Sequence, residues 1–531
     1  MSVVGAFCVS VNKEACLNAK MPGKCATCAE VCPHGVYALD DASGEMFIQN
    51  YNACVGCRIC VEFCPTNAIR INPAEPEYIS RYPWTFGVIE EIHYKAQTGD
   101  YLLRGFGTHG QTPNFDMITI VPSQIASDAP RDKYREECEM DVVIGEDTSE
   151  KPMHLKLPFV WPAMSFGALS KEAKMALAIG AAMTGIAANT GEGGLLPEEA
   201  WLSRGYSDEN STHKEWEPGG YLIVQWSTGR WGVSADYINS GDGIEVKIGQ
   251  GAKPGMGGHL LGAKVTKEVA QVRGIHEGTD ALSPCRYYDV QTPEDMKHMV
   301  DFLRNATDYK YPILFKLGPS RPYADVAACI EAGADAISID GLVGGTGCSP
   351  DLVTQGVGIP TIACIPPAVQ ALKDYGVHRK VKLIALGGIR NGLDSFKALA
   401  MGADAVGFGS AAEVAMGCRV CYACHKGNCP YGITSQKPEM RARLDPVEAG
   451  TRLANFIHAT AEEIKILTML SGHSRISDLS TEDLRAMDMN TAALTGLKLA
   501  GYERPLPMWE GGYSSISGNG RDGNGKSETA P

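Results

Sequence analysis

The chain has 531 residues, 44% hydrophobic and 21% charged, a composition typical of a folded globular protein with several domains. Its net charge of −14 argues against nucleic acid or an anionic membrane surface as a partner. Residues 1–19 show no basic segment followed by an apolar core, and no run of about 18 apolar residues exists, so we expect a cytoplasmic chain without a membrane span. There, the 18 cysteines are expected to be metal ligands or free thiols.

Cysteines at ferredoxin spacing occur twice near the N-terminus. Residues 54–65 read Cys-Val-Gly-Cys-Arg-Ile-Cys-Val-Glu-Phe-Cys-Pro, the C-x2-C-x2-C-x3-C-P run of bacterial ferredoxins. The short gaps wrap three thiolates around one cubane cluster, and the fourth cysteine reaches the other cluster. An earlier block, residues 25–33, keeps the C-x2-C-x3-C-P half, with its first ligand displaced upstream. Two such blocks favour clusters over the zinc site that paired C-x2-C motifs also form.

This pattern predicts that residues 1–75 form a small α+β ferredoxin-like domain holding two [4Fe–4S] clusters. The first ligand set is Cys54, Cys57, Cys60 and Cys32, and the second is Cys16, Cys25, Cys28 and Cys64. Cys8 is the alternative to Cys16, which we favour because it is nearer in sequence. Such a domain carries single electrons and performs no chemistry of its own.

Residues 76–157 are expected to be a linker and barrel entry segment, with prolines and aromatics at 72–84 and tight turns at 101–145. From residue 158, short apolar strands alternate with helical patterns, of which the clearest lie at 171–184, 294–305, 323–332 and 393–401. Eight β/α units over roughly 250 residues predict a TIM barrel at 158–440. The expected strands are 159–164, 185–189, 221–226, 243–248, 313–317, 336–340, 382–386 and 405–409.

Glycine-rich turns follow the last two expected strands, Ala-Leu-Gly-Gly-Ile-Arg at 385–390 and Gly-Phe-Gly-Ser at 407–410. Barrels often hold a phosphate at this place through backbone N–H groups, and glycine lets the backbone approach it closely. The alternative is that these glycines serve only tight turns. The candidate phosphate-binding residues are Gly387, Gly388, Gly409 and Ser410.

Other expected strand ends carry charged or amide side chains where a packed core would be apolar. For any single lysine, a solvated surface position is the simpler interpretation. Three lysines and an arginine around one barrel mouth could instead bind an anionic substrate and the flavin edge at which negative charge develops on reduction. The side chains concerned are Glu192, Lys247, Gln250, Lys253, Arg273 and Lys316.

A third cysteine group follows the eighth expected strand, where residues 417–430 read Gly-Cys-Arg-Val-Cys-Tyr-Ala-Cys-His-Lys-Gly-Asn-Cys-Pro. Its place beside the predicted phosphate site would suit electron transfer to a flavin bound there. The rest of the chain is expected to be a helical extension at 441–505, with helices at 446–470 and 481–500, and a disordered tail at 506–531. The scattered cysteines, interpreted as packing or pocket thiols, are Cys138, Cys285, Cys329, Cys348 and Cys364.

Five of these segments, 158–170, 189–194, 247–255, 344–350 and 417–430, are together similar to the flavin-binding synthase domain of glutamate synthases. The chain most closely resembles the short archaeal-type enzymes, which have an N-terminal ferredoxin domain. The resemblance implies that FMN binds the barrel and that a [3Fe–4S] cluster binds Cys418, Cys424 and Cys429. Cys421, at a position where the long enzymes have no cysteine, could add a fourth ligand and make that cluster [4Fe–4S]. Beyond the phosphate residues, the expected FMN contacts are Met164, Ser165, Asn189, Gln225, Lys316, Gly344 and Gly345.

The resemblance further implies that 2-oxoglutarate and ammonia form 2-iminoglutarate over the flavin and that hydride from the reduced flavin N5 then gives L-glutamate. Glu192, Lys247, Gln250 and Lys253 are the expected catalytic residues, and Arg273 joins the two lysines in binding substrate. A series of iron–sulfur clusters would deliver the electrons to the flavin. The chain is therefore predicted to be an oxidoreductase and the catalytic subunit of a glutamate synthase.

Differences from the long enzymes leave the partners and the amine open. The start, Met-Ser-Val-Val, lacks the cysteine nucleophile that hydrolyses glutamine, so ammonia is expected from solution or from a separate glutamine amidotransferase. No strand–GxGxxG–helix unit exists, so NADPH is expected to bind a partner, unless reduced ferredoxin donates directly. Met256 and Cys348 replace a glutamate and an alanine of the long enzymes. The alternatives are an N-methylglutamate synthase subunit using methylamine and an electron-transfer flavoprotein subunit of a larger redox complex.

Overall fold

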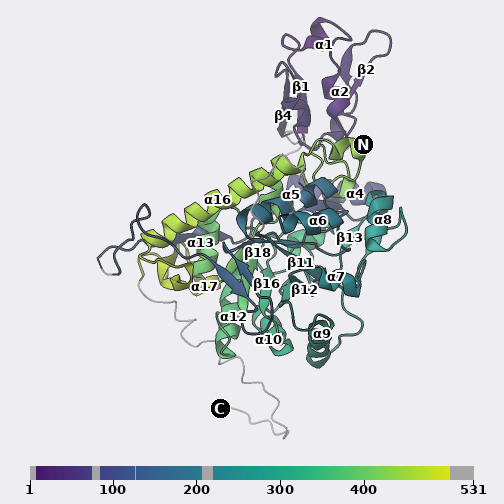
Figure 1. Ribbon diagram of the computed structural model, residues 1–531. Helices are drawn as coiled ribbons and strands as arrows, with labels where there is room; N and C mark the ends of the chain where they lie inside the picture. The colour runs from purple at the N-terminus through teal and green to yellow at the C-terminus, as the bar shows by residue number, and fades with distance from the viewer. Residues whose placement is uncertain (1–6, 74–83, 126, 206–218, 503–531) are drawn as a thin grey trace, which may run out of the picture.

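The structure is a computed structural model that describes residues 7–73, 84–125, 127–205 and 219–502. A small N-terminal domain stands on a large barrel domain, next to the long helix α16 (Pro446–Leu470) (Figure 1). Among the described residues, no helix is long and apolar enough to cross a membrane. The expected tail at 506–531 and most of the expected linker at 72–84 lie outside the described ranges.

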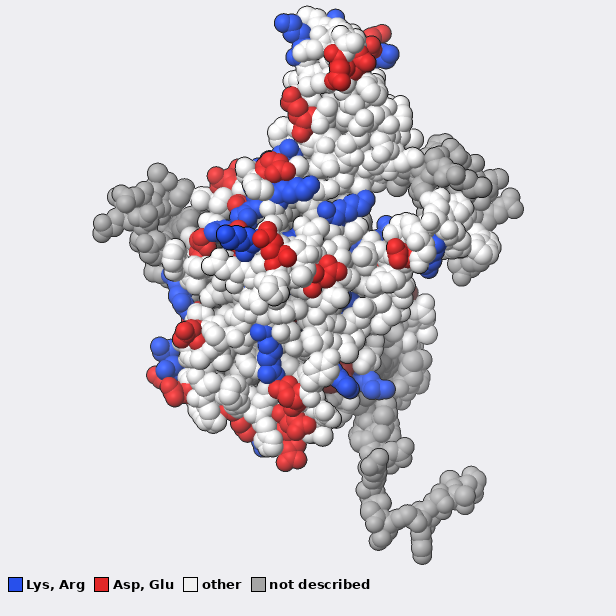
Figure 2. All heavy atoms as spheres, turned by 90° about the vertical axis from the view of Figure 1, so that its right-hand side faces the viewer, with Lys and Arg blue, Asp and Glu red and all other residues white. Residues whose placement is uncertain are grey.

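The N-terminal domain has an α+β fold of two antiparallel strand pairs and short helices. Cys54, Cys57 and Cys60 are buried in its small apolar core. On the face seen in Figure 2, its charged side chains gather mainly at the tip, and the part next to the barrel is largely uncharged. The strand pairs are β1 (Phe7–Val11) with β4 (Ile69–Pro73) and β2 (Tyr37–Leu39) with β3 (Met46–Ile48), and the helices are α1 (Leu17–Lys20), α2 (Thr27–Val31), η1 (Tyr51–Ala53) and α3 (Ile59–Glu62).

Eight parallel strands close into a barrel, which confirms the predicted fold. The first strand ends at Val160 rather than at 164, because Pro162 has no N–H to donate to a ladder. The last strand pairs with the first through Val406 and Phe159, which closes the barrel. The strands are β9 (Phe159–Val160), β10 (Ala187–Asn189), β11 (Tyr221–Trp226), β12 (Gly243–Lys247), β15 (Ile313–Leu317), β16 (Ala336–Asp340), β18 (Lys382–Leu386) and β19 (Ala405–Gly407).

Helices surround the barrel strands (Figure 1), and several of them begin at side-chain caps. The side chain of Ser170 accepts the N–H of Ala173 at the start of α5, and Gly185 ends that helix with φ of 69°. The outer helices are α5 (Lys171–Thr184), α6 (Pro197–Ser203), α7 (Ala235–Asn239), α8 (Lys267–Arg273), α9 (Pro293–Ala306), α10 (Pro322–Ala332), α11 (Asp351–Gly356), α12 (Thr361–Asp374), α13 (Gly392–Ala400), α14 (Ser410–Ala415) and α15 (Pro438–Arg441).

Additional segments pack around the ends of the barrel. Helix α4 (Phe86–Thr98) precedes them, and α16 packs along α5 and α13. The antiparallel pairs outside the barrel are β5 (Leu103–Phe106) with β17 (Thr346–Pro350), β6 (Ile118–Ile120) with β20 (Leu484–Ala486), β7 (Val142–Ile144) with β8 (Met153–Leu155), and β13 (His259–Leu260) with β14 (Ala281–Leu282).

The predicted helix at 481–500 is wrong, although the C-terminal region is helical at 446–470 as expected. Strand β20 lies near the start of the segment, because its backbone hydrogen bonds go to β6. Asp488 then starts the separate short helix α17 (Met489–Thr495) by accepting the N–H of Thr491.

A buried ion pair holds the carboxyl ends of the first two strands in place. The Lys174 ammonium lies 2.7 Å from the Glu199 carboxylate, and the two side chains are 0% and 1% exposed. The same ammonium donates to the backbone carbonyls of Met164 at 2.8 Å and Asn189 at 2.7 Å. Helices α5 and α6 are therefore tied to the chain segments that leave β9 and β10.

Replacing Lys174 by methionine should lower the free energy of unfolding by about 3–5 kcal/mol, because Glu199 would become an unpaired buried charge. The double change Lys174→Met with Glu199→Gln should cost less than the single change. The partly exposed pairs of Lys171 serve as the control, since Lys171→Met should cost about 0–1 kcal/mol. Urea unfolding followed by tryptophan fluorescence measures the three variants, and equal losses for Lys174→Met and Lys171→Met would contradict the assignment.

Candidate functional site

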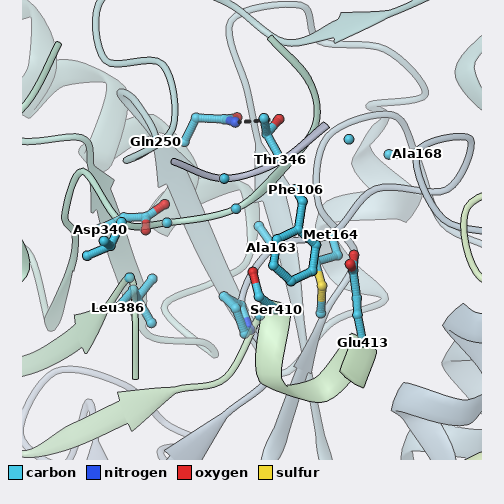
Figure 3. Close-up of a pocket in the computed structure, with 18 of the residues that line it drawn as sticks. Phe106, Ala163, Met164, Ala168, Gln250, Asp340, Thr346, Leu386, Ser410 and Glu413 are labelled. Carbon is cyan, nitrogen blue, oxygen red and sulfur yellow. Dashed lines mark hydrogen bonds between the residues drawn. The ribbon is translucent and has the colours of Figure 1, made fainter. Parts of the chain in front are cut away.

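A cavity of about 600 Å³ opens at the carboxyl ends of the barrel strands (Figure 3). Asn189 lies outside its lining: the side chain is buried and its amide donates to Glu245 at 3.0 Å. The remaining candidate catalytic, substrate and cofactor residues all line the cavity, namely Met164, Ser165, Glu192, Gln225, Lys247, Gln250, Lys253, Arg273, Lys316, Gly344, Gly345, Gly387, Gly388, Gly409 and Ser410.

Glu192 lies among cations on one wall of the cavity. Its carboxylate is 3.1 Å from the Lys247 ammonium and accepts the Ser283 hydroxyl at 3.2 Å. Burial by itself would raise the pKa of Glu192, but the charges of Lys247, Arg273 and Lys253 outweigh burial and hold the pKa below its ordinary value. The carboxylate is therefore ionised at neutral pH, and the wall keeps a net positive charge.

Lys253 is the cation of this wall whose charge is most easily lost. Burial, followed by repulsion from Lys247, lowers the pKa of Lys253 to about 8. Its ammonium donates to the backbone carbonyl of Cys348 at 2.6 Å, so the buried Cys348 positions the lysine through its main chain. At neutral pH, Lys253 is protonated and can bind an anion.

Arg273 reaches the same wall from α8. Its guanidinium donates to the Ser165 hydroxyl at 3.1 Å and to the Phe166 carbonyl at 2.8 Å, and it lies over the Trp231 ring. Gly193 has a φ of 110°, and a side chain there would place its Cβ 2.6 Å from the Arg273 guanidinium carbon. A glycine in the 189–194 turn is thus required for the arginine to lie in this place.

Further side chains from inside the barrel line the cavity beside this wall, where Lys316 is the strand partner of Lys247. Lys316 pairs with Asp340 at 3.2 Å, and the Gln225 amide donates to Glu245 at 2.7 Å. The Gln225 carbonyl oxygen Oε1 is buried and has no hydrogen-bond partner among the described residues. Because an unpaired buried acceptor is costly, this oxygen is placed to accept an N–H group from a ligand in the cavity.

The paired glycines after β18 approach neighbouring chain too closely for side chains. Gly387 and Gly388 have φ of 94° and 75°. A Cβ on Gly387 would lie 2.8 Å from the Gly341 carbonyl oxygen, and one on Gly388 would lie 2.8 Å from the Val343 side chain. This turn lies beside Gly409 and Ser410, where Figure 3 shows Ser410 at the start of α14. A compact anion would meet backbone here rather than side chains.

Sequence reasoning missed several lining residues. Thr346, whose hydroxyl accepts the Gln250 amide at 3.3 Å, lies in the 344–350 segment that carries the resemblance, so that segment was the signal available for it. Phe106 and Glu413 had no such signal. Phe106 enters the cavity because β5 pairs with β17, and Glu413 lies one helical turn beyond Ser410 (Figure 3). The pKa of Glu413 is raised by burial to about 7.

The second predicted set of cysteines in the N-terminal domain surrounds a small cavity of about 20 Å³. Cys16, Cys25, Cys28 and Cys64 all line it, whereas Cys8 does not and is exposed on β1. The backbone N–H of Ala68 donates to the Cys64 sulfur at 3.2 Å. The structure therefore favours Cys16 over Cys8, and it brings the distant Cys64 to this set as a two-cluster ferredoxin requires.

The other predicted set comes together on the side of the domain nearer the barrel. Cys60 accepts the Tyr37 hydroxyl at 3.2 Å, and burial, with Cys32 and Cys54 close by, raises the pKa of Cys60 to about 11. In the parts of the chain that the structure describes, no three His, Cys, Asp or Glu side chains converge to hold a single metal ion. Four thiols around a common centre instead fit an iron–sulfur cluster, because the cysteine sulfurs that bind a cluster lie farther apart than the sulfurs that bind a single metal ion.

The third cysteine group lies between the cavity and the N-terminal domain. Cys418 and Cys429 pack against the barrel core, and Cys421 packs against the core of the N-terminal domain. The Tyr431 hydroxyl donates to the Cys57 carbonyl at 2.8 Å, and Arg419 forms an ion pair with Glu62. Next to Cys424, His425 lines the cavity. This segment therefore contacts both the barrel domain and the N-terminal domain.

Comparison with known proteins agrees with this arrangement. Residues 114–474 match the model of the conserved region in glutamate synthase, and residues 23–69 match that of a 4Fe–4S dicluster domain. The chain is 42% identical to a glutamate synthase large subunit-like protein of Rhizobium meliloti over 78% of this chain and 93% of that protein. It is 36% identical to archaeal-type glutamate synthase (NADPH) of Thermotoga sp., over 90% of this chain and 96% of that protein.

A similar match comes from an archaeon. The chain is 36% identical to archaeal glutamate synthase (NADPH) of Archaeoglobus fulgidus, over 90% of this chain and 94% of that protein. The matches to these relatives cover both the cysteine-rich N-terminal region and the barrel, which is the combination that the structure displays. The chain belongs to the glutamate synthase family.

Proposed function

We propose that the chain is the catalytic subunit of a glutamate synthase, which converts 2-oxoglutarate and ammonia through 2-iminoglutarate to L-glutamate. The observation that carries the proposal is the cationic wall of Lys247, Lys253 and Arg273 around the single carboxylate of Glu192. A dianionic oxo-acid complements that wall. Relatives named glutamate synthase match the chain over most of their length.

The walls of the cavity also fit FMN. Backbone at Gly387, Gly388, Gly409 and Ser410 would hold its phosphate, and the unpaired Gln225 oxygen would accept a ring N–H. Lys316 would face the ring edge at which negative charge develops. When bound, FMN supplies the two electrons that reduce the imine carbon.

The chain's own residues divide the remaining work. Lys247, Lys253 and Arg273 bind and orient the carboxylates of 2-oxoglutarate. Glu192 is held ionised by these cations, so its carboxylate can accept a proton as the amine adds to the keto carbon. Gln250, fixed by its bond to Thr346, orients the substrate at the mouth of the cavity.

The Fe–S domain gives the electrons their entry. Two [4Fe–4S] clusters in the N-terminal domain and a third cluster on the 418–429 segment would carry single electrons to the cavity. The donor is a partner that oxidises NADPH or a reduced ferredoxin, and ammonia comes from solution or from a separate glutamine amidotransferase.

The direct test is a single turnover without oxygen. The chain is reconstituted with FMN, iron and sulfide and then reduced by dithionite. Addition of 2-oxoglutarate and ammonia should reoxidise the flavin and form a stoichiometric amount of L-glutamate. Omission of either substrate should leave the flavin reduced. Methylamine in place of ammonia tests the N-methylglutamate alternative. The proposal fails if neither amine reoxidises the flavin, and the amine is reassigned if methylamine alone does so.

Affinity for 2-oxoglutarate should depend on pH through Lys253. The lysine is charged below its pKa of about 8 and neutral above it, so affinity should be full at lower pH and fall about tenfold per pH unit above 8. Perturbation of the oxidised flavin spectrum by 2-oxoglutarate, without ammonia, measures the affinity. Lys253→Met should weaken binding about 10–150-fold, the equivalent of about 1.5–3 kcal/mol, and abolish the pH dependence.

The matched control is Lys267→Met, since Lys267 is exposed on α8. This variant should keep the affinity and the pH profile of the natural chain. A Lys253→Met chain that retains the fall in affinity above pH 8 would show that another group titrates.

A further inference from the structure

The cysteine run at 418–429 repeats the plan of the ferredoxin run at 54–64. Each begins with C-x2-C-x2-C, and each ends with a fourth cysteine followed by proline, at Cys64 and at Cys429. Only the last gap differs, with three residues in the first run and four in the second. The middle cysteine of the later run is Cys421, which corresponds to Cys57.

The backbone of the two runs follows the same path. In the ferredoxin run, the residues on either side of Cys57, Gly56 and Arg58, have φ of 71° and 61°. In the later run, the residues on either side of Cys421, Val420 and Tyr422, have φ of 54° and 55°. Left-handed backbone is unfavourable for a β-branched valine and a bulky tyrosine, and it persists only where the surroundings impose it. The loop is thus held with left-handed residues on either side of its middle cysteine, as in the ferredoxin run.

The sulfurs of the two runs also receive the same backbone hydrogen bonds. The N–H of Val420 donates to the Cys418 sulfur at 3.3 Å, and the N–H of Ala423 donates to the Cys421 sulfur. In the ferredoxin run, Cys54 and Cys57 likewise accept the N–H of the residue two positions on. Backbone N–H groups aimed at sulfur stabilise the negative charge of cluster thiolates.

Cys421 lies with the other three thiols of its group. Cys418, Cys424 and Cys429 all interact electrostatically with Cys421. Cys424 is buried, and the other three side chains are partly buried. Cys421 also neighbours Cys57 and packs against the N-terminal core. It is the member of the group that faces the ferredoxin domain, whereas Cys418 and Cys429 face the barrel.

We propose that Cys418, Cys421, Cys424 and Cys429 together hold a third [4Fe–4S] cluster, in place of the [3Fe–4S] cluster that three cysteines would hold. All four ligands belong to the 418–429 segment, and Cys421 is the ligand that packs against the N-terminal domain, so the cluster lies at the contact between the two bodies. The ligand assignment stands on the loop alone. The role of the cluster as a relay rests on the proposed function.

Electron paramagnetic resonance of the full chain, purified without oxygen and mildly oxidised, tests this assignment. An oxidised [3Fe–4S] cluster is paramagnetic, whereas an oxidised [4Fe–4S] cluster of ferredoxin type is silent. The natural chain should be silent. Cys421→Ala should show a [3Fe–4S] signal stoichiometric with the chain and one iron fewer per chain. Cys138→Ala is the control, because Cys138 lies outside the three groups, and it should remain silent.

Two results would overturn the proposal. One is a stoichiometric [3Fe–4S] signal from the natural chain, a measurement that needs no variant to fold. The other is a silent Cys421→Ala chain with unchanged iron content, which would show that Cys421 is not a ligand. Failure of the glutamate assay with a silent natural chain and a paramagnetic Cys421→Ala chain would reject the function and leave the cluster assignment intact.

Discussion

The 418–429 segment has to touch two separate bodies at once, and the rest of the structure depends on that constraint. Its cysteines lie between a barrel cavity and a small domain with its own core. The polar contacts at the junction include the Tyr431 hydroxyl with the Cys57 carbonyl and the Glu62 carboxylate, the ion pair of Arg419 with Glu62, and Arg443 donating to the Val31 carbonyl at 3.3 Å. A relay of single electrons requires such a junction, because neither body alone contains both the entry point and the cavity.

The barrel provides the other half of the account by collecting charge at one end. Its strands are apolar along most of their length, yet Lys247 and Lys316 close two of them with buried cations paired to Glu192 and Asp340. Burial reduces the screening of these charges by water, so they act strongly on any charged group that enters the cavity. The buried ion pair of Lys174 holds the strand ends that present these groups.

Sequence alone predicted all eight barrel strands, because each is a short apolar run between turn signals, and it grouped the cysteines by spacing. It placed Asn189 in the cavity, where the structure instead turns its amide to Glu245. It also predicted a helix at 481–500, since periodicity cannot reveal that β20 pairs with the distant β6. Phe106 was missed for the same reason, because the pairing of β5 with the distant β17 brings it to the cavity, whereas Glu413 is brought there by helix α14. Sequence proximity favoured Cys16 over Cys8, and the structure supports that choice by placing Cys16 around one small cavity with Cys64.

We propose that electrons cross from the N-terminal domain to the flavin through this junction, and stopped-flow flavin reduction by reduced ferredoxin tests this path. Arg419→Glu should slow the reduction by placing two carboxylates at the junction, and the double change Arg419→Glu with Glu62→Arg should restore it. Dithionite, which is small enough to enter the cavity directly, should reduce the flavin of every variant at one rate. Equal rates with ferredoxin for the natural chain and Arg419→Glu would contradict the account.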